Sequence, residues 1–164
     1  MQLSTERLLL RRPTMADLGA FFEIMSNPSA MRYWSTLPHA DPDVTRHWLA
    51  AMVEREKIGG QHFAIELDGR LIGEVGAGRL PEFGFIIHPD HWGRGFATEA
   101  SRAAIAHIFA ATAAPELRAD VDPRNAGSLK VLDHLGFRET GRARNTFLLG
   151  DEWCDSIYLA LNRP

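Results

Sequence analysis

The chain has 164 residues, 45% hydrophobic and 24% charged, with a formal net charge of −3 at pH 7, and we expect residues 1–164 to fold as a single domain. No apolar run approaches the roughly 20 residues that a membrane-spanning helix needs, and the N-terminus lacks the charged-then-apolar order of a secretory signal, so we expect a cytoplasmic protein without membrane partners. The slightly negative charge argues against nucleic acid as a partner, because proteins that bind nucleic acid usually present a basic stripe.

Local signals in the first half of the chain predict helices and a hairpin. Thr14 and Asp17 have the spacing of a capping box, and the dipeptide Asp41-Pro42 is typical of a helix start. The turn over 68–70, Asp-Gly-Arg, is a strong hairpin signal between two strand-like runs. In chain order, the predicted elements are a strand over 8–12, a helix over 15–26, a helix from 41 to about 59, and strands over 62–67 and 71–77.

The second half predicts a strand that leads into a helix with a small-residue face. Pro89 ends the strand, and alanines recur at helical spacing from Ala97 to Ala111, which lets a helix pack closely on a sheet. The expected elements are a strand over 82–88, a helix over 97–111, a strand over 117–121, a helix over 126–135, and strands over 142–149 and 153–161. Together the two halves predict a mixed, mainly antiparallel sheet flanked by helices.

The loop Trp92-Gly93-Arg94-Gly95-Phe96-Ala97, between this strand and helix, is the most informative segment. Glycines let backbone amides approach an anion closely, and the N-terminus of the following helix adds roughly half a positive charge. The loop therefore indicates a phosphate or pyrophosphate site, with an ordinary helix start as the alternative.

Two well-known phosphate motifs do not describe this loop. The nucleotidase type needs glycine-lysine followed by serine or threonine, and the loop has neither the lysine nor the spacing. The dinucleotide fingerprint needs a glycine where Thr98 stands and a parallel βαβ pattern, whereas the upstream strands are predicted to form hairpins. A nucleotide-dependent oxidoreductase stays open as a weaker alternative.

The stretch from Glu82 to Ala100 resembles the acetyl-CoA motif of the GNAT superfamily of N-acetyltransferases, most of all the branch of the RimJ and RimL ribosomal-protein N-terminal acetyltransferases. The resemblance covers nearly the whole chain. Trp92 departs from the general motif, which has glutamine or arginine at that position. The resemblance implies an acyl-CoA N-acyltransferase fold, an α/β (α+β) architecture whose central sheet opens in a V-shaped splay. Further matches follow in order at residues 8–13, 27–28, 125–128, 135–137 and 153–155.

The resemblance also implies acetyl-CoA as co-substrate, held by the glycine loop at its pyrophosphate and by the preceding strand along its pantetheine arm, in the manner of a missing strand. Asn125 and Ser128 would lie near the pantetheine and the thioester sulfur. Each also has a structural interpretation, since Asn125 is a good helix N-cap and Ser128 fits the first turn of that helix. The cofactor residues implied are Phe85, Ile86, Ile87, His88, Gly93, Arg94, Gly95, Phe96, Ala97, Thr98, Asn125 and Ser128.

Acetyl transfer to an amine requires a neutral nitrogen, so a base must remove a proton from an ammonium group. Glu82, which opens the strand leading to the acyl group, is the first candidate for this base, and the alternative is a solvated acid at a strand end. Asp155 and His88 are weaker candidates. For the proton that the departing thiolate needs, Ser128 is preferred to Tyr33.

Several other groups have expected roles. A strand amide near Phe85 or Ile86, left unpaired by the splay, would stabilise the oxyanion. Cys154 is the single cysteine and has no adjacent histidine to activate it, so we expect a packed side chain rather than a nucleophile. His88 and His91 lack further ligands, and no metal is expected. Core or cleft-wall positions are expected for Trp34, Trp48, Trp92 and Trp153.

The predicted function is an N-acetyltransferase that moves an acetyl group from acetyl-CoA to a primary amine by direct attack in a ternary complex. The alternative is a non-catalytic acyl-CoA-binding module. The resemblance implies that residues 27–40 and the loop around 142–151 select the acceptor; protein N-termini, amino acids and small amines all fit. It also implies a homodimer.

Overall fold

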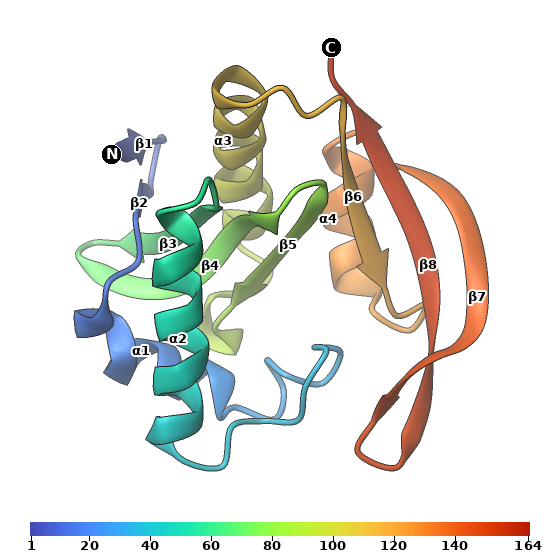
Figure 1. The fold of residues 1–164 in the computed structure, drawn as a ribbon, viewed down its shortest axis with the longest axis horizontal. Helices are drawn as coiled ribbons and strands as arrows, with labels where there is room; N and C mark the ends of the chain where they lie inside the picture. The colour runs from blue at the N-terminus through green and yellow to red at the C-terminus, as the bar shows by residue number, and fades with distance from the viewer.

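The computed structural model describes residues 1–164 and contains one open sheet of eight strands, in the order β1-β2-β3-β4-β5-β6-β8-β7 (Figure 1). The strands are β1 (Gln2–Ser4), β2 (Leu9–Arg11), β3 (Gln61–Leu67), β4 (Arg70–Arg79), β5 (Glu82–Ile87), β6 (Glu116–Val121), β7 (Arg138–Leu149) and β8 (Glu152–Asn162). The helices are α1 (Leu18–Met25), α2 (Pro42–Glu56), α3 (Phe96–Ala111) and α4 (Ala126–His134), with short 3₁₀ helices η1 (Met15–Asp17) and η2 (Pro89–His91).

The sheet is antiparallel except between β5 and β6, which run parallel. These two strands pair at one point, Glu82 with Arg118, where the Arg118 amide donates to the Pro81 carbonyl over 2.8 Å. Beyond this point the strands separate. The mainly antiparallel sheet and its V-shaped splay are therefore confirmed.

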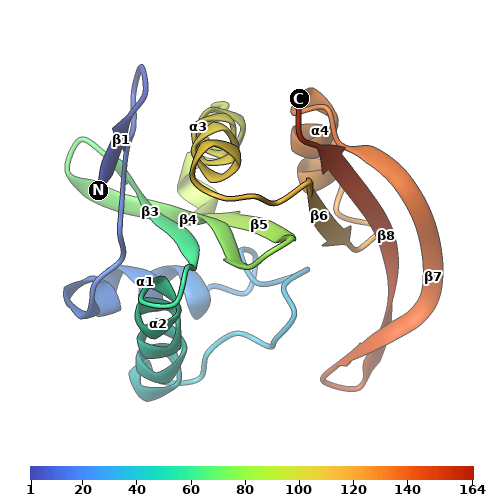
Figure 2. The same ribbon diagram turned by 45° about the horizontal axis from the view of Figure 1, so that its top comes forward.

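Helices cover both faces of the sheet, α1 and α2 on one side and α3 on the other (Figure 2). The larger core lies on the α3 side, where Ala100 and Ala104 are fully buried and let the helix sit close to the strands. A smaller core fills the space between α1, α2 and the opposite face, with Phe21 and Leu49 at its centre. The two cores hold β5 from both sides and fix the strand that borders the opening.

The local signals lie where the sequence predicts them. Thr14 donates its backbone N–H to the Asp17 carboxylate over 2.7 Å, and the carboxylate of Asp41 accepts from the amides of Asp43 and Val44 at the start of α2. Between β3 and β4, Asp68 and Gly69 both have positive φ, as a tight hairpin turn requires. Each of these helix starts and turns depends on residues close together in the chain, so the sequence alone predicts where they lie.

Three boundaries differ from expectation. Strand β1, which pairs with β2, was not predicted, because three residues are too few to show a strand pattern. Strand β7 begins at Arg138 rather than at 142, since its first residues are polar and solvent-exposed on an edge strand. The first predicted helix is divided into η1 and α1.

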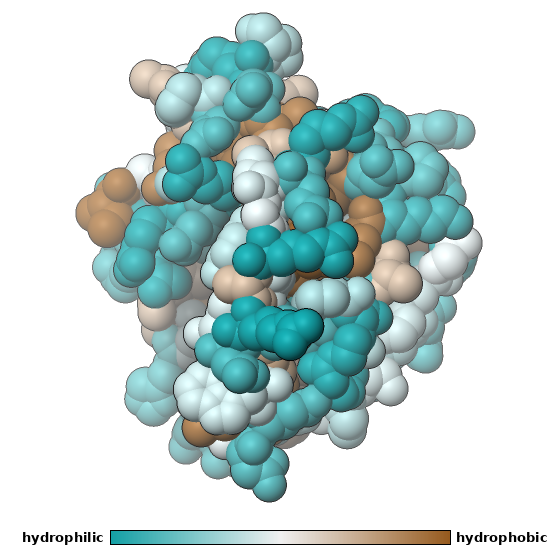
Figure 3. Space-filling model, turned by 90° about the vertical axis from the view of Figure 1, so that its right-hand side faces the viewer, coloured by the Kyte–Doolittle hydropathy of each residue, from teal (hydrophilic) through white to brown (hydrophobic).

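The surface over β7 and β8 is mostly hydrophilic, with hydrophobic side chains showing between polar ones (Figure 3). Arg138, Glu139, Arg142 and Arg144 lie on β7, the strand at the edge of the sheet. Charged side chains on an edge strand discourage pairing with another sheet. No helix in the structure is both long and apolar enough to cross a membrane.

Candidate active site

The edge of β5 that faces the splay carries unpaired backbone groups. His88 donates its N–H to the Ile72 carbonyl on β4. In an antiparallel pair, every second residue of a strand directs its N–H and C=O toward the partner strand, and the residues between direct theirs away from it. The N–H and C=O of Ile86 therefore face β4, while those of Phe85 and Ile87 face the opening. Of the two amides expected to stabilise an oxyanion, that of Phe85 has the required direction and that of Ile86 is used within the sheet.

The glycine loop lies at the far end of this edge and leads into α3. Gly93 and Gly95 have φ values of 71° and 80°, a left-handed conformation that favours glycine. A Cβ added to Gly93 would meet nothing within 4 Å, so the loop backbone is open on that side. Backbone amides in this conformation, at the N-terminus of a 16-residue helix, form a cradle that fits a pyrophosphate.

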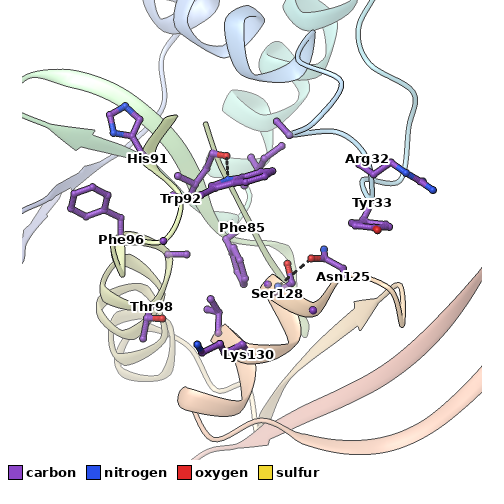
Figure 4. A pocket seen from close by; sticks show the side chains of 18 of the residues that line it. Arg32, Tyr33, Phe85, His91, Trp92, Phe96, Thr98, Asn125, Ser128 and Lys130 are labelled. Atoms are coloured by element: carbon purple, nitrogen blue, oxygen red, sulfur yellow. Dashed lines mark hydrogen bonds between the residues drawn. The ribbon is translucent and has the colours of Figure 1, made fainter. Parts of the chain in front are cut away.

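Trp92 closes one side of the opening. Its indole Nε1 donates to the backbone carbonyl of Ile87 over 2.8 Å (dashed in Figure 4), and its side chain is 53% exposed. The residue that departs from the family motif therefore satisfies one of the free carbonyls on the edge of β5.

These elements enclose a cavity of about 890 Å³, within the size range of small-molecule sites in proteins. Phe85 points into the cavity from β5, opposite Asn125 and Ser128 on α4, while Thr98 and Lys130 lie on facing sides further along (Figure 4). Ten of the twelve predicted cofactor residues line this cavity: Phe85, Ile86, Ile87, Gly93, Gly95, Phe96, Ala97, Thr98, Asn125 and Ser128.

The start of α4 forms the wall opposite β5. Asn125 is the N-cap, and its Oδ1 accepts from the backbone N–H of Ser128 over 3.1 Å. This cap engages only the oxygen of the Asn125 amide, so its NH₂ group is left for a ligand. The Ser128 hydroxyl makes no hydrogen bond within the chain and faces the same space.

The third wall comes from the segment between α1 and α2, where Tyr33 lies with the Arg32 and Arg124 guanidinium groups 4.9 and 5.6 Å from its ring centre. Arg124 binds Asp122 through two nitrogens and also pairs with Glu152, and these hydrogen bonds hold the pKa of Asp122 below its ordinary value. Glu152 lies 3.5 Å from Arg32. The α1–α2 segment is thus joined to the β7–β8 hairpin at one end of the cavity.

Three of the predicted residues do not line the cavity. Glu82 is exposed at the end of β5 where the two strands are still paired, because pairing with Arg118 closes the V there. His88 caps η2 by accepting the Asp90 amide through Nδ1. Arg94 places its guanidinium 4.8 Å from the ring centre of Phe96, away from the opening.

Other predicted groups have clear positions. Cys154 is buried, as expected for a packed side chain. Trp48 packs against Phe21 in the smaller core, but Trp153 is 58% exposed and does not line the main cavity, so the expected core or cleft-wall position is wrong for that residue. Asp155 accepts the Asn145 amide instead of facing the main cavity. No three His, Cys, Asp or Glu side chains gather to hold a metal ion.

Lys130, Arg124 and Arg32 line the cavity, although no sequence motif singles them out. Lys130 lies two residues after Ser128 on the helix predicted over 126–135, so its closeness to a candidate site residue could have been noticed in the sequence. The two arginines come from separate segments, and no local pattern joins them.

A sheet that splays beside a glycine loop, with a capped helix across the opening, defines the class of acyl-CoA N-acyltransferases. Residues 7–138 match the family model described as the acetyltransferase (GNAT) domain. The chain belongs to this GNAT family, and it is an acetyl-CoA-dependent N-acyltransferase.

Similar proteins include an uncharacterised N-acetyltransferase, p20, of Bacillus licheniformis, 30% identical over 154 residues that cover 87% of this chain and 85% of the relative. Spermidine N(1)-acetyltransferase of Escherichia coli K12 is 26% identical over 172 residues, which cover 96% of this chain and 87% of the relative. The fold is shared with RimL, the ribosomal L7/L12 α-N-protein acetyltransferase in complex with coenzyme A, at a TM-score of 0.87 and 16% identity over 99% of this chain and 98% of that one.

Proposed function

We propose that the chain transfers the acetyl group of acetyl-CoA to a primary amine by direct attack in a ternary complex. One observation carries the proposal: a single cavity holds the glycine loop, the unpaired edge of β5 and the polar start of α4. The glycine loop and the edge of β5 bind acetyl-CoA, and the thioester faces the polar start of α4. An acceptor entering beside Tyr33 meets the thioester without any covalent enzyme intermediate.

The donor site is assigned residue by residue. Amides of the loop from Gly93 to Thr98 bind the pyrophosphate, and the Phe85 carbonyl together with the Ile87 amide pairs with the pantetheine arm. The NH₂ group of Asn125 donates to the same arm. Lys130, whose side chain lies on the opposite wall, adds a positive charge on the phosphate side.

In the transfer step, the neutral acceptor nitrogen attacks the thioester carbonyl, the N–C bond forms and the C–S bond breaks. The Phe85 amide stabilises the negative charge that develops on the carbonyl oxygen. Ser128 donates its proton to the departing thiolate and is reprotonated from water, and the proton released by the acceptor nitrogen leaves through water.

Glu82 is proposed to receive that proton through water, not by direct contact. Its carboxylate lies outside the cavity, but Gly84, on the same face of β5, is exposed and leaves open space beside the strand. Water occupying this space connects the cavity with Glu82. Compared with Ser128, Glu82 has less geometric support.

The lining of the cavity bears on the acceptor. The lysine and arginine side chains that line it are Arg32, Arg124 and Lys130, and no carboxylate lines it. Asp122 and Glu152 neutralise Arg32 and Arg124 from outside the cavity, so no carboxylate is left facing the cavity to bind the second ammonium group of a polyamine. We therefore propose an acceptor with one amine, such as a protein N-terminus or an amino acid, over a polyamine.

A thiol-release assay with acetyl-CoA tests this function, with peptides beginning in serine or alanine, amino acids, small monoamines and spermidine as acceptors. We expect turnover with a monoamine acceptor and little with spermidine. Coenzyme A binding without turnover on any acceptor would instead indicate a non-catalytic acyl-CoA-binding module.

The single domain and the remaining partners are also proposals. One continuous sheet from β1 to β7 supports a single domain over residues 1–164, and the net charge of −3 supports the absence of a nucleic-acid partner. The homodimer rests on the family resemblance alone.

A further inference from the structure

The turn between β1 and β2 packs against the glycine loop, although about ninety residues separate them in the sequence. Its contact point is Glu99, in the first turn of α3. One carboxylate oxygen accepts from the Thr5 hydroxyl over 2.6 Å and from the Arg7 backbone N–H over 2.9 Å, and the other accepts from Arg7 Nε over 2.7 Å. Four hydrogen bonds and ion-pair contacts thus join the turn to the helix that follows the loop.

Arg7 also reaches the loop itself. Its Nη1 donates to the backbone carbonyl of Arg94 over 3.0 Å, and its guanidinium carbon lies 4.5 Å from the ring centre of Phe96. A Cβ added to Gly95 would lie 3.5 Å from Nη2 of Arg7. Arg7 therefore covers the side of the loop that faces away from the opening.

The bond to the Arg94 carbonyl fixes the direction of the next amide. In a trans peptide the C=O and the following N–H point in opposite directions, so a carbonyl held toward Arg7 turns the Gly95 N–H away from Arg7. Gly95 lines the cavity. Because Gly93 and Gly95 flank this peptide and glycine tolerates many backbone conformations, rotation of the peptide would otherwise point a carbonyl oxygen at the bound phosphates.

Arg7 has a second effect through Glu99. A carboxylate in the first turn of α3 stands close to the proposed phosphate position, and phosphates repel it. Burial opposes the ionisation of Glu99, but the hydrogen bonds from Thr5 and Arg7 outweigh it and hold the pKa of Glu99 below its ordinary value. Glu99 is therefore charged at neutral pH, and the Arg7 guanidinium neutralises that charge.

We propose that Arg7 is a positioning residue of the pyrophosphate loop, which orients the Gly95 amide toward coenzyme A by holding the Arg94 carbonyl on the opposite side. The proposal rests on the proposed donor site. It adds a residue from the first hairpin that does not itself line the cavity and that neither the loop motif nor the cavity identifies.

The test measures coenzyme A affinity by calorimetry, which needs no knowledge of the acceptor. Arg7→Gln is expected to weaken binding about tenfold to a hundredfold, the range of one charge-assisted hydrogen bond. Arg102→Gln is the matched control, an exposed arginine on α3 for which the structure shows no ion pair, and it is expected to bind as the parent protein does.

A double variant separates orientation from charge. Arg7→Gln combined with Glu99→Gln has the parent net charge but lacks the guanidinium, so it should regain only the part of the affinity lost to repulsion by Glu99 and still bind coenzyme A more weakly than the parent protein. Recovery of parent affinity in the double variant would overturn the proposal, because it would show that Arg7 acts only by neutralising Glu99.

Arg7→Lys guards against a folding defect, since it keeps the charge and the contact with Glu99 but cannot also reach the Arg94 carbonyl. It should melt near the parent temperature, bind more weakly, and shift the Gly95 amide resonance in the absence of ligand. Unchanged affinity in Arg7→Lys and Arg7→Gln, with the parent protein binding coenzyme A, would disprove only this inference. Failure of the parent protein to bind coenzyme A would instead disprove the donor site.

Discussion

Trp92 donates its indole N–H to the backbone carbonyl of Ile87, with 2.8 Å between Nε1 and the oxygen. Phe85 and Ile87 present two amides and two carbonyls to the splay, and Trp92 occupies one of the carbonyls. Three groups are left for the donor: the Phe85 carbonyl and the Ile87 amide for the pantetheine arm, and the Phe85 amide for the thioester oxygen. A tryptophan at this position thus ties the loop to the strand before it, which makes the two halves of the donor site one unit.

Replacing Trp92 by phenylalanine keeps an aromatic wall and removes the N–H donor. We expect the free energy of unfolding, measured by urea denaturation, to fall by about 1 kcal/mol, the usual net contribution of one hydrogen bond. Coenzyme A affinity should change less than about threefold, because the exposed carbonyl can bind water instead. A tenfold loss of affinity would mean that the bond to Ile87 holds the loop and the strand in the geometry that binds coenzyme A.

The roles of the capping oxygen and of the NH₂ group in the Asn125 side chain can be separated by substitution. Asn125→Ala removes the N-cap and the NH₂ group together, so we expect a loss of stability of about 1 kcal/mol and weaker coenzyme A binding. Asn125→Ser keeps a capping oxygen and should retain most of the stability while binding as weakly as the alanine variant. Equal affinity in the serine variant and the parent would assign Asn125 to capping alone.

Ser128→Ala tests the proton donor to the thiolate. Because its hydroxyl makes no hydrogen bond within the chain, its loss should leave the melting temperature within about 2 °C of the parent value. We expect kcat to fall by about tenfold to a hundredfold while the KM for acetyl-CoA stays similar, since the hydroxyl acts as the C–S bond breaks. If kcat is unchanged, Tyr33→Phe becomes the informative variant, because Tyr33 is the other hydroxyl considered as the proton donor and it also lines the cavity.

Glu82→Gln measures the contribution of a base that acts through water. A base in direct contact contributes roughly a hundredfold to ten-thousandfold; since Glu82 lies outside the cavity, we expect kcat to fall by only about tenfold. Asp120→Asn, at an exposed position on β6 for which the structure shows no ion pair, serves as the comparison for a change of charge near the sheet. A loss above a hundredfold would show that Glu82 reaches the acceptor directly.

The pH dependence of stability is expected to depend on His62, whose Nδ1 lies 2.6 Å from the buried carboxylate of Glu74. Burial alone would lower the pKa of His62, but the Glu74 carboxylate outweighs it, and the pKa is raised above 6.5. The protonated histidine therefore stabilises the fold fully below about pH 6.5, and this stabilisation is lost as the pH rises through the raised pKa.

The difference in unfolding free energy between the parent protein and His62→Gln should accordingly be largest near pH 6 and shrink toward pH 9. Urea denaturation at several pH values measures it. His47→Gln, at an exposed position on α2, should show no such trend. A difference that grows with pH would contradict the assignment.

Much of the fold follows from signals that act over a few residues. The capping box at Thr14, the Asp-Gly turn after β3 and the proline after β5 each fix a local backbone conformation, so the elements they bound were predictable. Strand β1 was not, because it is stabilised by its pairing with β2 rather than by a pattern of its own. The donor half of the site was predictable for a similar reason: left-handed backbone at Gly93 and Gly95 requires glycine, and this requirement is visible in the sequence.

The sequence by itself determined the order of the elements, the glycine loop and the family resemblance, since all three depend on residues adjacent in the chain. The tertiary structure alone decided which backbone groups remain free and which side chains meet. Pairing of β5 with β6 at a single point sets where the sheet opens, and so places Phe85 inside the cavity and Glu82 outside it. The contact of Arg7 with the loop spans 87 residues, and no local pattern reveals a contact that only folding creates.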